Sequence, residues 1–422
     1  MIKLGIIVLL VLFLFAFNKD KLSPNSFFLG LWFVVVLLYD LHLFEIYSIS
    51  SYTWTVLFFG LIAFEAGYLL NERFILTSYS KKSTSNSNSN SSVNVSLINI
   101  LILIAFFSSL PTGFYRIKFL ISNGFDVGAV KNALIIGKLP SGTILDTFIV
   151  SPLSPLITYI STYYLINSPK NKIISFSGIY FTLYYYFISG ARLSILYYII
   201  ALFINLRISG KSFDLIPVKI KKWILRIIIP LLVLLVYLMT KNTENGLKNI
   251  YYYLCGCVPM LDHVVNRQYG YFDLGRTNGT LSFYGIVNPF CQILSRFGFK
   301  ELGNVCQIAE NYLANIELPN YAGADRMYNA FVTYTASFYI DFGLLGVIVL
   351  SFVFGFFSSH YYKEYIQKNS LYDALPIGVI YVFVLTSIIK FGFTGYRFGL
   401  GYLYILGLRK VLFKKNDSND RQ

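Results

Sequence analysis

Eleven long apolar runs divide the sequence, and they constrain its fold more than any other feature. A backbone in hydrocarbon must satisfy its hydrogen bonds internally, so apolar runs of about 20 residues without strand-like alternation predict membrane-spanning helices. We therefore predict an all-α polytopic membrane protein with about eleven transmembrane helices. The runs cover residues 4–17, 27–45, 51–70, 95–112, 143–166, 173–190, 192–207, 223–240, 334–358, 373–389 and 393–408.

The composition supports a membrane location. Hydrophobic residues make up 56% of the 422-residue chain and charged residues only 13%, against about 25% charged residues in a typical soluble domain. Too few charges remain to cover a water-soluble surface, so the composition excludes a soluble enzyme. The high aromatic content also excludes a disordered chain.

The distribution of Lys and Arg between alternate loops predicts the orientation. One set of loops holds 19 basic residues and the short segments of the opposite set hold 8. Basic residues favour the cytoplasmic side, so we expect the N-terminus outside and the C-terminus inside. The formal charge of +15 then faces cytoplasm and anionic lipid, and nucleic acid is not needed as a partner.

A Ser/Asn-rich tract at 83–92 divides the chain. Such a tract has no apolar content to fold around and is typical of a linker. We predict an N-terminal three-helix portion at 1–70, a cytoplasmic linker at 71–94 and a main transmembrane portion at 95–422. Within the last portion, residues 113–142 mix basic and apolar side chains, which suits a helix at the membrane surface.

Residues 241–328 form the largest predicted outside loop. The loop holds seven acidic and seven basic residues among many aromatics, and a loop of this length predicts a small folded unit with a function. All four cysteines lie in it, which supports an oxidising outer face. We favour one or two disulfides linking the Cys255/Cys257 pair to Cys291 and Cys306; zinc ligation is the alternative, although the usual C-x2-C spacing is missing.

Ionisable groups in or near spans are costly to insert and are therefore functional candidates. Arg192 and Arg397 each lie in a predicted tight outside turn. The alternative to a functional role for either residue is that it anchors the helix end at the membrane interface. Arg276 and Arg326 flank the aromatic part of the outside loop, and Arg suits bidentate phosphate contacts. Asp341 lies about 10 Å inside the ninth span, where a carboxylate needs a proton or a partner such as an outside-facing Arg.

Other ionisable residues offer weaker candidates. His263 beside Asp262 is a candidate general base, although a lone loop histidine is more often packed or simply exposed. Glu65 and Asp146 lie near span ends, where an interfacial role is favoured. No D-x-D pair occurs in the outside loops, and no phosphate-binding loop or nucleophile elbow occurs in the sequence. We predict no metal and no cofactor, so an enzyme here needs a substrate that is already activated.

Three features carry a family resemblance: YFISGARLSIL at 186–196, MYNAFVTYTASFYIDFGLLG at 327–346, and the long outside loop before the ninth span. In these features and in its hydropathy profile, the chain resembles the Wzy-type oligosaccharide repeat-unit polymerases of bacterial O-antigen and capsule synthesis. The resemblance implies a GT-C-like glycosyltransferase of the bacterial inner membrane, with residues 241–328 in the periplasm. Its substrates would be undecaprenyl-pyrophosphate-linked oligosaccharides, and a chain-length regulator and a flippase would be its protein partners.

The resemblance also implies roles for the charged candidates. Guanidinium groups of Arg192, Arg276 and Arg326, with Arg397 in reserve, would hold the departing pyrophosphate. Asp341 would orient one of them or act as base, with His263 as the alternative base.

Three other functions stay open on the sequence alone. An O-antigen ligase performs the same chemistry on a different acceptor. A lipid-linked oligosaccharide flippase also needs cations for pyrophosphate, although its charges would follow a central cavity. A nonenzymatic scaffold of the export machinery is the third.

Overall fold

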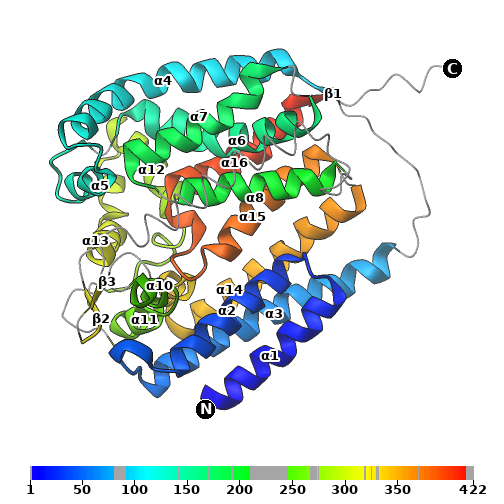
Figure 1. The fold of residues 1–422 in the computed structure, drawn as a ribbon, viewed down its shortest axis with the longest axis vertical. Helices are drawn as coiled ribbons and strands as arrows, with labels where there is room; N and C mark the ends of the chain where they lie inside the picture. The colour runs from blue at the N-terminus through cyan, green and yellow to red at the C-terminus, as the bar shows by residue number, and fades with distance from the viewer. Residues whose placement is uncertain are drawn as a thin grey trace. The chain divides into compact units, whose positions relative to one another are not determined.

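The computed structural model of the chain is predominantly helical (Figure 1). Among the residues that it describes, five helices are long and apolar enough to cross a membrane. The count of eleven spans and their orientation remain predictions, and the run at 223–240 lies outside the described part, as does most of the Ser/Asn tract. The described residues are 2–79, 92–140, 142–168, 171–191, 193–209, 246–266, 273, 275–317, 320–324, 326–328, 332–368 and 370–414.

The chain forms two compact units, each assembled from separate stretches of sequence. The predicted linker at 71–94 contains the first change from one unit to the other, but the predicted main portion at 95–422 is divided between both. The N-terminal helices thus share a unit with residues 241–328, the predicted outside loop. Unit 1 comprises Met1–Ser83, Tyr237–Glu364 and Ile380–Gly395, and unit 2 comprises Thr84–Val236, Tyr365–Val379 and Tyr396–Gln422.

Unit 1 contains the N-terminal helices, the helices of the outside loop and one long helix that follows the loop. In chain order its elements are α1 (Ile2–Lys19), α2 (Pro24–Asp40), η1 (Leu43–Glu45), α3 (Ser51–Tyr79), α10 (Gly246–Cys255), α11 (Cys257–Val265), α12 (Tyr284–Arg296), η3 (Lys300–Asn304), α13 (Gln307–Glu317), α14 (Tyr334–Lys368) and η4 (Gly392–Thr394). The short strands β2 (Asn320–Gly323) and β3 (Arg326–Tyr328) pair antiparallel. Helix α15 (Leu371–Leu385) begins in unit 2 and ends in unit 1.

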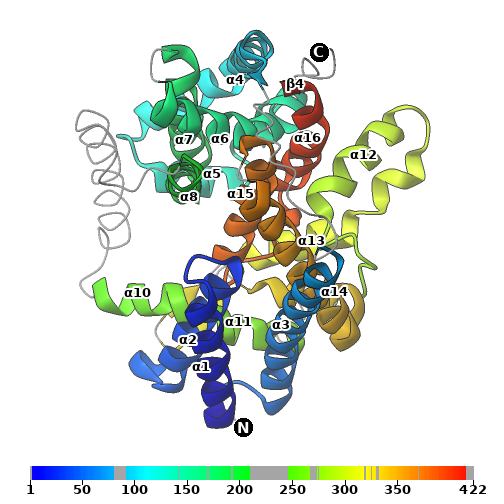
Figure 2. The same ribbon diagram turned by 90° about the vertical axis from the view of Figure 1, so that its right-hand side faces the viewer.

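Local signals in the sequence explain where α2 begins. Ser23 is its N-cap and accepts a hydrogen bond from the backbone N–H of Ser26 at 3.1 Å, and Pro24 occupies the first helical position. A serine cap satisfies one of the unpaired N–H groups of the first turn, and proline there loses no helical hydrogen bond. Helix α10 of the outside loop packs against α2 (Figure 2).

Helices α3 and α14 approach closely because each presents a glycine to the other's backbone. A Cβ atom on Gly67 would lie 2.0 Å from the carbonyl oxygen of Phe352, and one on Gly355 would lie 1.9 Å from that of Phe64. Small residues allow such close backbone contact between membrane helices. Any larger side chain at either glycine would force the two helices apart.

Unit 2 is a helical bundle around α6, which is buried along most of its length. Helices α7, α8 and α16 all pack against α6. The predicted surface helix at 113–142 is not a single helix, because residues 113–122 continue α4. The elements are α4 (Val95–Ser122), α5 (Val127–Ile135), η2 (Asp146–Val150), α6 (Ser151–Asn167), α7 (Lys172–Ser189), α8 (Leu193–Ile208), α16 (Tyr396–Leu412), and the paired strands β1 (Ser92–Val93) and β4 (Phe413–Lys414).

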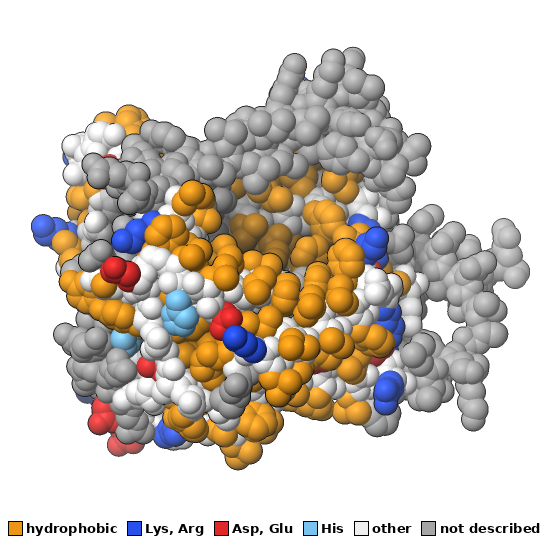
Figure 3. All heavy atoms as spheres, turned by 60° about the horizontal axis from the view of Figure 1, so that its bottom comes forward, with side chains coloured by type: hydrophobic (Ala, Val, Ile, Leu, Met, Phe, Trp, Pro, Cys, Tyr) orange, Lys and Arg blue, Asp and Glu red, His pale blue; other side chains and the backbone are white. Residues whose placement is uncertain are grey.

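Large apolar side chains cover much of the outer surface of unit 1. Figure 3 shows a face on which hydrophobic side chains form a broad area with few charged ones. On α1, Leu4, Ile7, Val11 and Phe15 are each more than 50% exposed. Apolar side chains that point away from the protein suit hydrocarbon rather than water. The arrangement agrees with a membrane location for these helices.

Candidate functional site

The structure describes four of the six charged site residues predicted from the sequence. Arg192 lies outside the described residues, and for Arg326 only the backbone, in β3, is described. Arg276, Asp341 and His263 belong to unit 1, whereas Arg397 belongs to unit 2. We therefore describe a unit 1 site around Asp341 and a unit 2 site around Arg397, each by itself.

Asp341 finds its partners in residues 277–282, within the predicted outside loop. Its side chain is fully buried in α14, and one carboxylate oxygen accepts hydrogen bonds from the Thr277 hydroxyl and from the N–H groups of Gly279 at 2.9 Å and Leu281 at 3.2 Å. The other oxygen accepts from the N–H of Ser282 at 2.9 Å. The expected arginine partner is replaced by backbone donors, which compensate the burial of a carboxylate.

These contacts anchor residues 277–282 to α14. All four donors come from a single turn, so the Asp341 carboxylate fixes the conformation of the segment that leads into α12. A carboxylate that is already saturated with donors is poorly placed to accept a substrate proton. The geometry favours the orienting role for Asp341 over the role of base.

Arg276 immediately precedes the anchored turn. Its side chain is exposed, its Nη1 donates to the carbonyl oxygen of Tyr339, and its guanidinium lies 5.4 Å from the centroid of the Tyr339 ring. Within the described residues no carboxylate forms an ion pair with it. The guanidinium therefore keeps donors that face solvent.

Gly343 makes room for this guanidinium. It breaks the regular geometry of α14 with φ 69° and ψ −154°, a conformation that glycine adopts without a steric penalty. A Cβ atom at this position would lie 2.9 Å from Nη2 of Arg276. The kink in α14 and the position of Arg276 thus depend on the same residue.

Arg397 lies at the start of α16, among hydroxyl and aromatic side chains of unit 2. Its Nε donates to the Ser154 hydroxyl at 3.0 Å, and its guanidinium lies over the Tyr185 ring at 4.1 Å and near the Tyr197 ring at 5.8 Å. The Tyr185 hydroxyl in turn lies 3.1 Å from the Ser151 hydroxyl. These contacts hold the guanidinium between α6, α7 and α8.

One nitrogen of Arg397, Nη2, is buried and has no hydrogen-bond partner among the described residues. A buried guanidinium N–H without an acceptor costs free energy, and most buried polar groups in proteins are paired. The planar fork of an arginine matches the oxygens of a phosphate. An anionic group would supply the missing acceptor at this position.

Arg116 is a charged residue of unit 2 whose role the sequence did not predict. It is only 4% exposed, and it donates to the carbonyl oxygens of Ile188 at 3.0 Å and Pro140 at 2.7 Å. Ile188 belongs to the last turn of α7, which ends at Gly190 in the left-handed conformation. A cation at a helix C-terminus stabilises the exposed carbonyl groups there. Arg116 thus secures the C-terminal end of α7.

Asp146, for which the sequence favoured an interfacial position, forms hydrogen bonds within unit 2. One of its oxygens accepts from the Thr112 hydroxyl and from the N–H of Thr143 at 3.1 Å, and the other accepts from the Tyr184 hydroxyl at 3.0 Å. The carboxylate therefore ties α4, η2 and α7 together. Only a weak sequence pattern indicated this contact. That pattern is a run of hydroxyl-bearing residues near the end of α7.

His263 and Asp262 are engaged in contacts within unit 1. His263 is 4% exposed and its Nε2 lies 2.8 Å from the carbonyl oxygen of Tyr321, so that nitrogen carries a proton. Asp262 accepts from the N–H of Ser50 at 2.9 Å and the hydroxyl of Thr53 at 2.6 Å, at the start of α3. The geometry favours a packing role for both residues over the predicted role of base.

All four cysteines are buried free thiols, so none of the predicted disulfides is present in the structure. The Cys306 thiol contacts Cys291, whereas Cys255 lies against the carbonyl oxygen of Val35. The predicted link from the Cys255/Cys257 pair to Cys291 and Cys306 is therefore not among the contacts of the described residues. No group of three or more His, Cys, Asp or Glu side chains among the described residues is placed to hold a metal ion.

Comparisons with known protein families, with curated proteins and with solved structures found no match to this chain.

Proposed function

We propose that this chain is a multi-pass glycosyltransferase of the bacterial inner membrane that polymerises lipid-linked oligosaccharide repeat units. The growing glycan is transferred from undecaprenyl pyrophosphate to a new lipid-linked unit at the periplasmic face, during O-antigen or capsule synthesis. The resemblance of residues 186–196 and 327–346 motivates this proposal. The apolar helices supply the membrane location that such a substrate requires.

The unpaired Nη2 of Arg397 is the observation that carries the proposal. It provides a buried donor for an anion, in a helical bundle where the hydroxyls of Ser151 and Ser154 lie close by. A pyrophosphate that leaves an anomeric carbon gains negative charge as the bond breaks. A donor fixed in a place of low polarity stabilises that charge more strongly than water does.

Every bond made and broken in the proposed transfer step is accounted for without a metal ion or a cofactor. A hydroxyl oxygen of the acceptor sugar forms a bond to the anomeric carbon of the donor, and the bond from that carbon to the pyrophosphate oxygen breaks. The hydroxyl proton passes to solvent water, and the bond electrons leave with the pyrophosphate. Arg397 stabilises the negative charge that develops on the leaving group.

A polymerisation assay in detergent tests the proposal. Purified protein mixed with lipid-linked repeat units is expected to yield a ladder of longer glycans on a gel. A flippase would yield none, because there is no bilayer to cross. An O-antigen ligase would act only after its own acceptor is added, so a product that appears solely with lipid A core would replace the polymerase with the ligase.

The matched control is a change in the same helix but away from the proposed site. Lys410 lies in the last turn of α16, where it is exposed. The Lys410→Ala variant is expected to keep the ladder, whereas Arg397→Ala is expected to lose its long members. Equal activity in the two variants would refute the role of Arg397.

A further inference from the structure

Glu65 is a buried carboxylate inside the apolar helix α3. It is only 3% exposed, and in the described part of the chain neither carboxylate oxygen has a hydrogen-bond partner. Its helix is among those long and apolar enough to cross a membrane. The sequence favoured an interfacial position for this residue, but burial without a donor is a costly state for an ionised carboxylate.

Asn25, near the start of α2, lies beside Glu65. It is also 3% exposed, and the described residues provide no donor for its side-chain oxygen, Oδ1. An acceptor oxygen of Asn25 and both carboxylate oxygens of Glu65 are therefore buried without a donor among the described residues. A proton on Glu65 would convert one of its oxygens into an O–H donor, which Oδ1 of Asn25 can accept. One proton thus gives both unpaired groups a hydrogen-bond partner.

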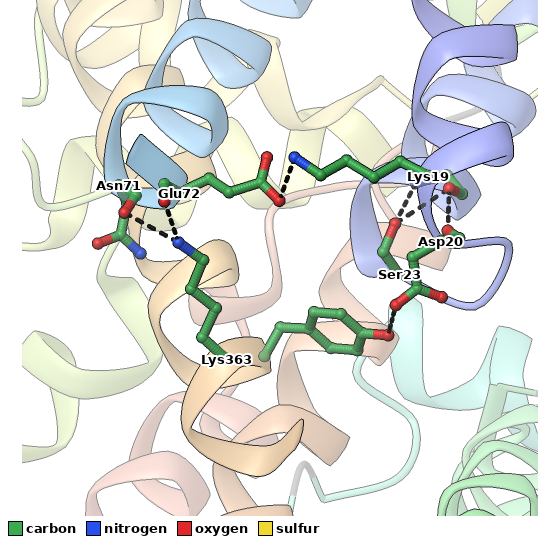
Figure 4. A network of polar contacts seen from close by, with 8 residues as sticks. Lys19, Asp20, Ser23, Asn71, Glu72 and Lys363 are labelled. Carbon is green, nitrogen blue, oxygen red and sulfur yellow. Dashed lines mark hydrogen bonds and ion pairs between the residues drawn. The ribbon is translucent and has the colours of Figure 1, made fainter. Parts of the chain in front are cut away.

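The nearby cations are occupied with other partners (Figure 4). Lys19 forms an ion pair with Glu72 at 2.7 Å, and Lys363 of α14 donates to the carbonyl oxygens of Asn71 at 3.2 Å and of Glu72. Glu72 lies seven residues from Glu65, or about 10 Å along α3. The charges of Lys19 and Glu72 reach Glu65 with opposite sign and offset each other.

The remaining titratable groups around the contact come from the ends of the same helices. Asp20, which follows α1, accepts a hydrogen bond from the hydroxyl of Tyr362 in α14. Tyr68 lies one turn after Glu65 on α3 and contacts Ser23. None of these groups is a cation that could neutralise the carboxylate. Glu65 is left with a bound proton as its means of neutralisation.

We propose that Glu65 is a proton-binding site, and that the packing of α2 against α3 requires the bound proton. The acid O–H of Glu65 donates to the side-chain oxygen of Asn25. Loss of the proton leaves a buried negative charge without a cation and the Asn25 oxygen without a donor, and this loosens the contact. The Lys19, Glu72 and Lys363 network lies next along α3 and provides polar groups through which the proton exchanges. The site is independent of the proposed polymerase activity.

Infrared spectroscopy of the whole protein in liposomes measures this proton directly. A protonated carboxyl group has a C=O stretching band that is distinct from the carboxylate bands and shifts in D2O. The difference between wild type and Glu65→Gln at neutral pH is expected to contain this band, and a rise in pH is expected to remove it. Glutamine mimics the neutral acid and still donates to Asn25, so this variant is expected to fold.

Glu72→Gln is the matched control, because Glu72 lies on the same helix but is paired with Lys19. Its difference spectrum is expected to contain only carboxylate bands at neutral pH. A second variant, Asn25→Ala, removes the acceptor, so the Glu65 band is expected to disappear about one pH unit lower, which is the value of about one hydrogen bond.

Three outcomes would overturn the proposal. Carboxylate bands alone for Glu65 at neutral pH would show that no proton is bound. A band in Asn25→Ala that survives to higher pH would show that the amide donates to an ionised Glu65. A band that disappears when sodium is added at constant pH would show that the site holds a monovalent cation.

Discussion

The unit 1 and unit 2 sites hold the same functional group in opposite ways. In unit 1, Arg276 is exposed, and its support comes from the Tyr339 carbonyl and from a turn that Asp341 anchors. In unit 2, Arg397 lies between aromatic rings, with one nitrogen buried and unpaired. One site presents a hydrated cation on a rigid support, whereas the other holds a cation whose hydration is already lost.

This difference determines what each arginine can contribute to anion binding. An exposed guanidinium exchanges water for the anion, so its net gain is small and is screened by salt. A buried guanidinium has already lost water in the folded protein, so an anion gains its hydrogen bond in a place of low polarity. The unit 2 site is therefore expected to stabilise an anion more strongly than the unit 1 site does.

The largest expected effect is the loss of activity in Arg397→Ala. Removal of one fixed donor from a charge-stabilising site lowers kcat by about 100-fold to 1000-fold. Arg397→Lys keeps the charge but loses the planar contact with Tyr185, and we expect partial activity. Initial rates of glycan elongation in detergent measure both effects. Full activity in Arg397→Ala would show that the unit 2 site does not stabilise an anion more strongly than the unit 1 site.

The second effect is a loss of stability in Asp341→Asn. The asparagine amide places a donor against backbone N–H groups that the carboxylate now accepts, and the lost charge-assisted hydrogen bonds are expected to cost about 3 kcal/mol. Thermal unfolding in detergent measures the change. The control is Glu310→Gln, since Glu310 is exposed on α13, and it is expected to leave the unfolding temperature unchanged. Equal unfolding temperatures for the two variants would show that Asp341 does not anchor the loop.

The third effect comes from Gly343→Ala. A side chain there meets a positive φ and the Arg276 guanidinium, so a destabilisation of about 1 to 3 kcal/mol is expected. Gly407 on α16 has no atom within 4 Å of an added Cβ, so Gly407→Ala is the matched control and is expected to be neutral or slightly stabilising. Similar unfolding temperatures for both variants would show that the unit 1 site does not depend on the kink at Gly343.

A pH dependence is expected from the buried thiols of the outside loop. Burial raises the pKa of the Cys255 thiol to about 12. Burial, with the adjacent Cys291, raises the pKa of the Cys306 thiol to about 12. A free thiol ionises near pH 8.5, so the stability from each buried thiol is complete below that pH and is lost as the pH rises towards 12.

The loss is at most about 1.4 kcal/mol per thiol for each pH unit. Unfolding temperatures measured between pH 8 and pH 10 are expected to fall more steeply in wild type than in Cys255→Ala. Parallel curves would show that the Cys255 thiol is not buried in the folded loop.

The smallest effect is expected for Arg276→Ala. An exposed cation over a tyrosine ring contributes about 0.5 to 1 kcal/mol, so we expect a decrease of less than tenfold in elongation rate. The decrease should shrink as salt is added, because exposed charges are screened. The same assay over a range of salt concentrations tests this. A loss as large as that of Arg397→Ala, and independent of salt, would show that Arg276 is desolvated in the substrate complex.

Much of the helical content could be predicted from hydropathy, because an apolar run of sufficient length can satisfy its backbone only as a helix. The runs at 4–17, 51–70 and 334–358 correspond to α1, α3 and α14. The surface helix at 113–142 was wrong as a single element, since its first residues extend α4. Hydropathy does not distinguish buried basic residues from exposed ones, so it could not predict that Arg116 is buried.

The candidate site was predictable in its residue types but not in its contacts. A carboxylate within a membrane span costs free energy, so the sequence alone was enough to mark Asp341 as a functional candidate. Its partners, the backbone N–H groups of 279–282, lie some 60 residues earlier in the chain. Backbone donors have no residue type that could mark them in a sequence.

By itself, the sequence determined that this chain is helical and that its apolar helices suit a membrane, because both follow from the composition and length of local runs. The tertiary structure decided which polar atoms remain unpaired. The sequence already marked Glu65 and Arg397 as ionisable candidates, but only the helices that enclose them showed that atoms of both side chains are buried without a partner among the described residues. The pairing of a buried polar atom depends on all its neighbours in space, and a linear pattern contains only those along the chain.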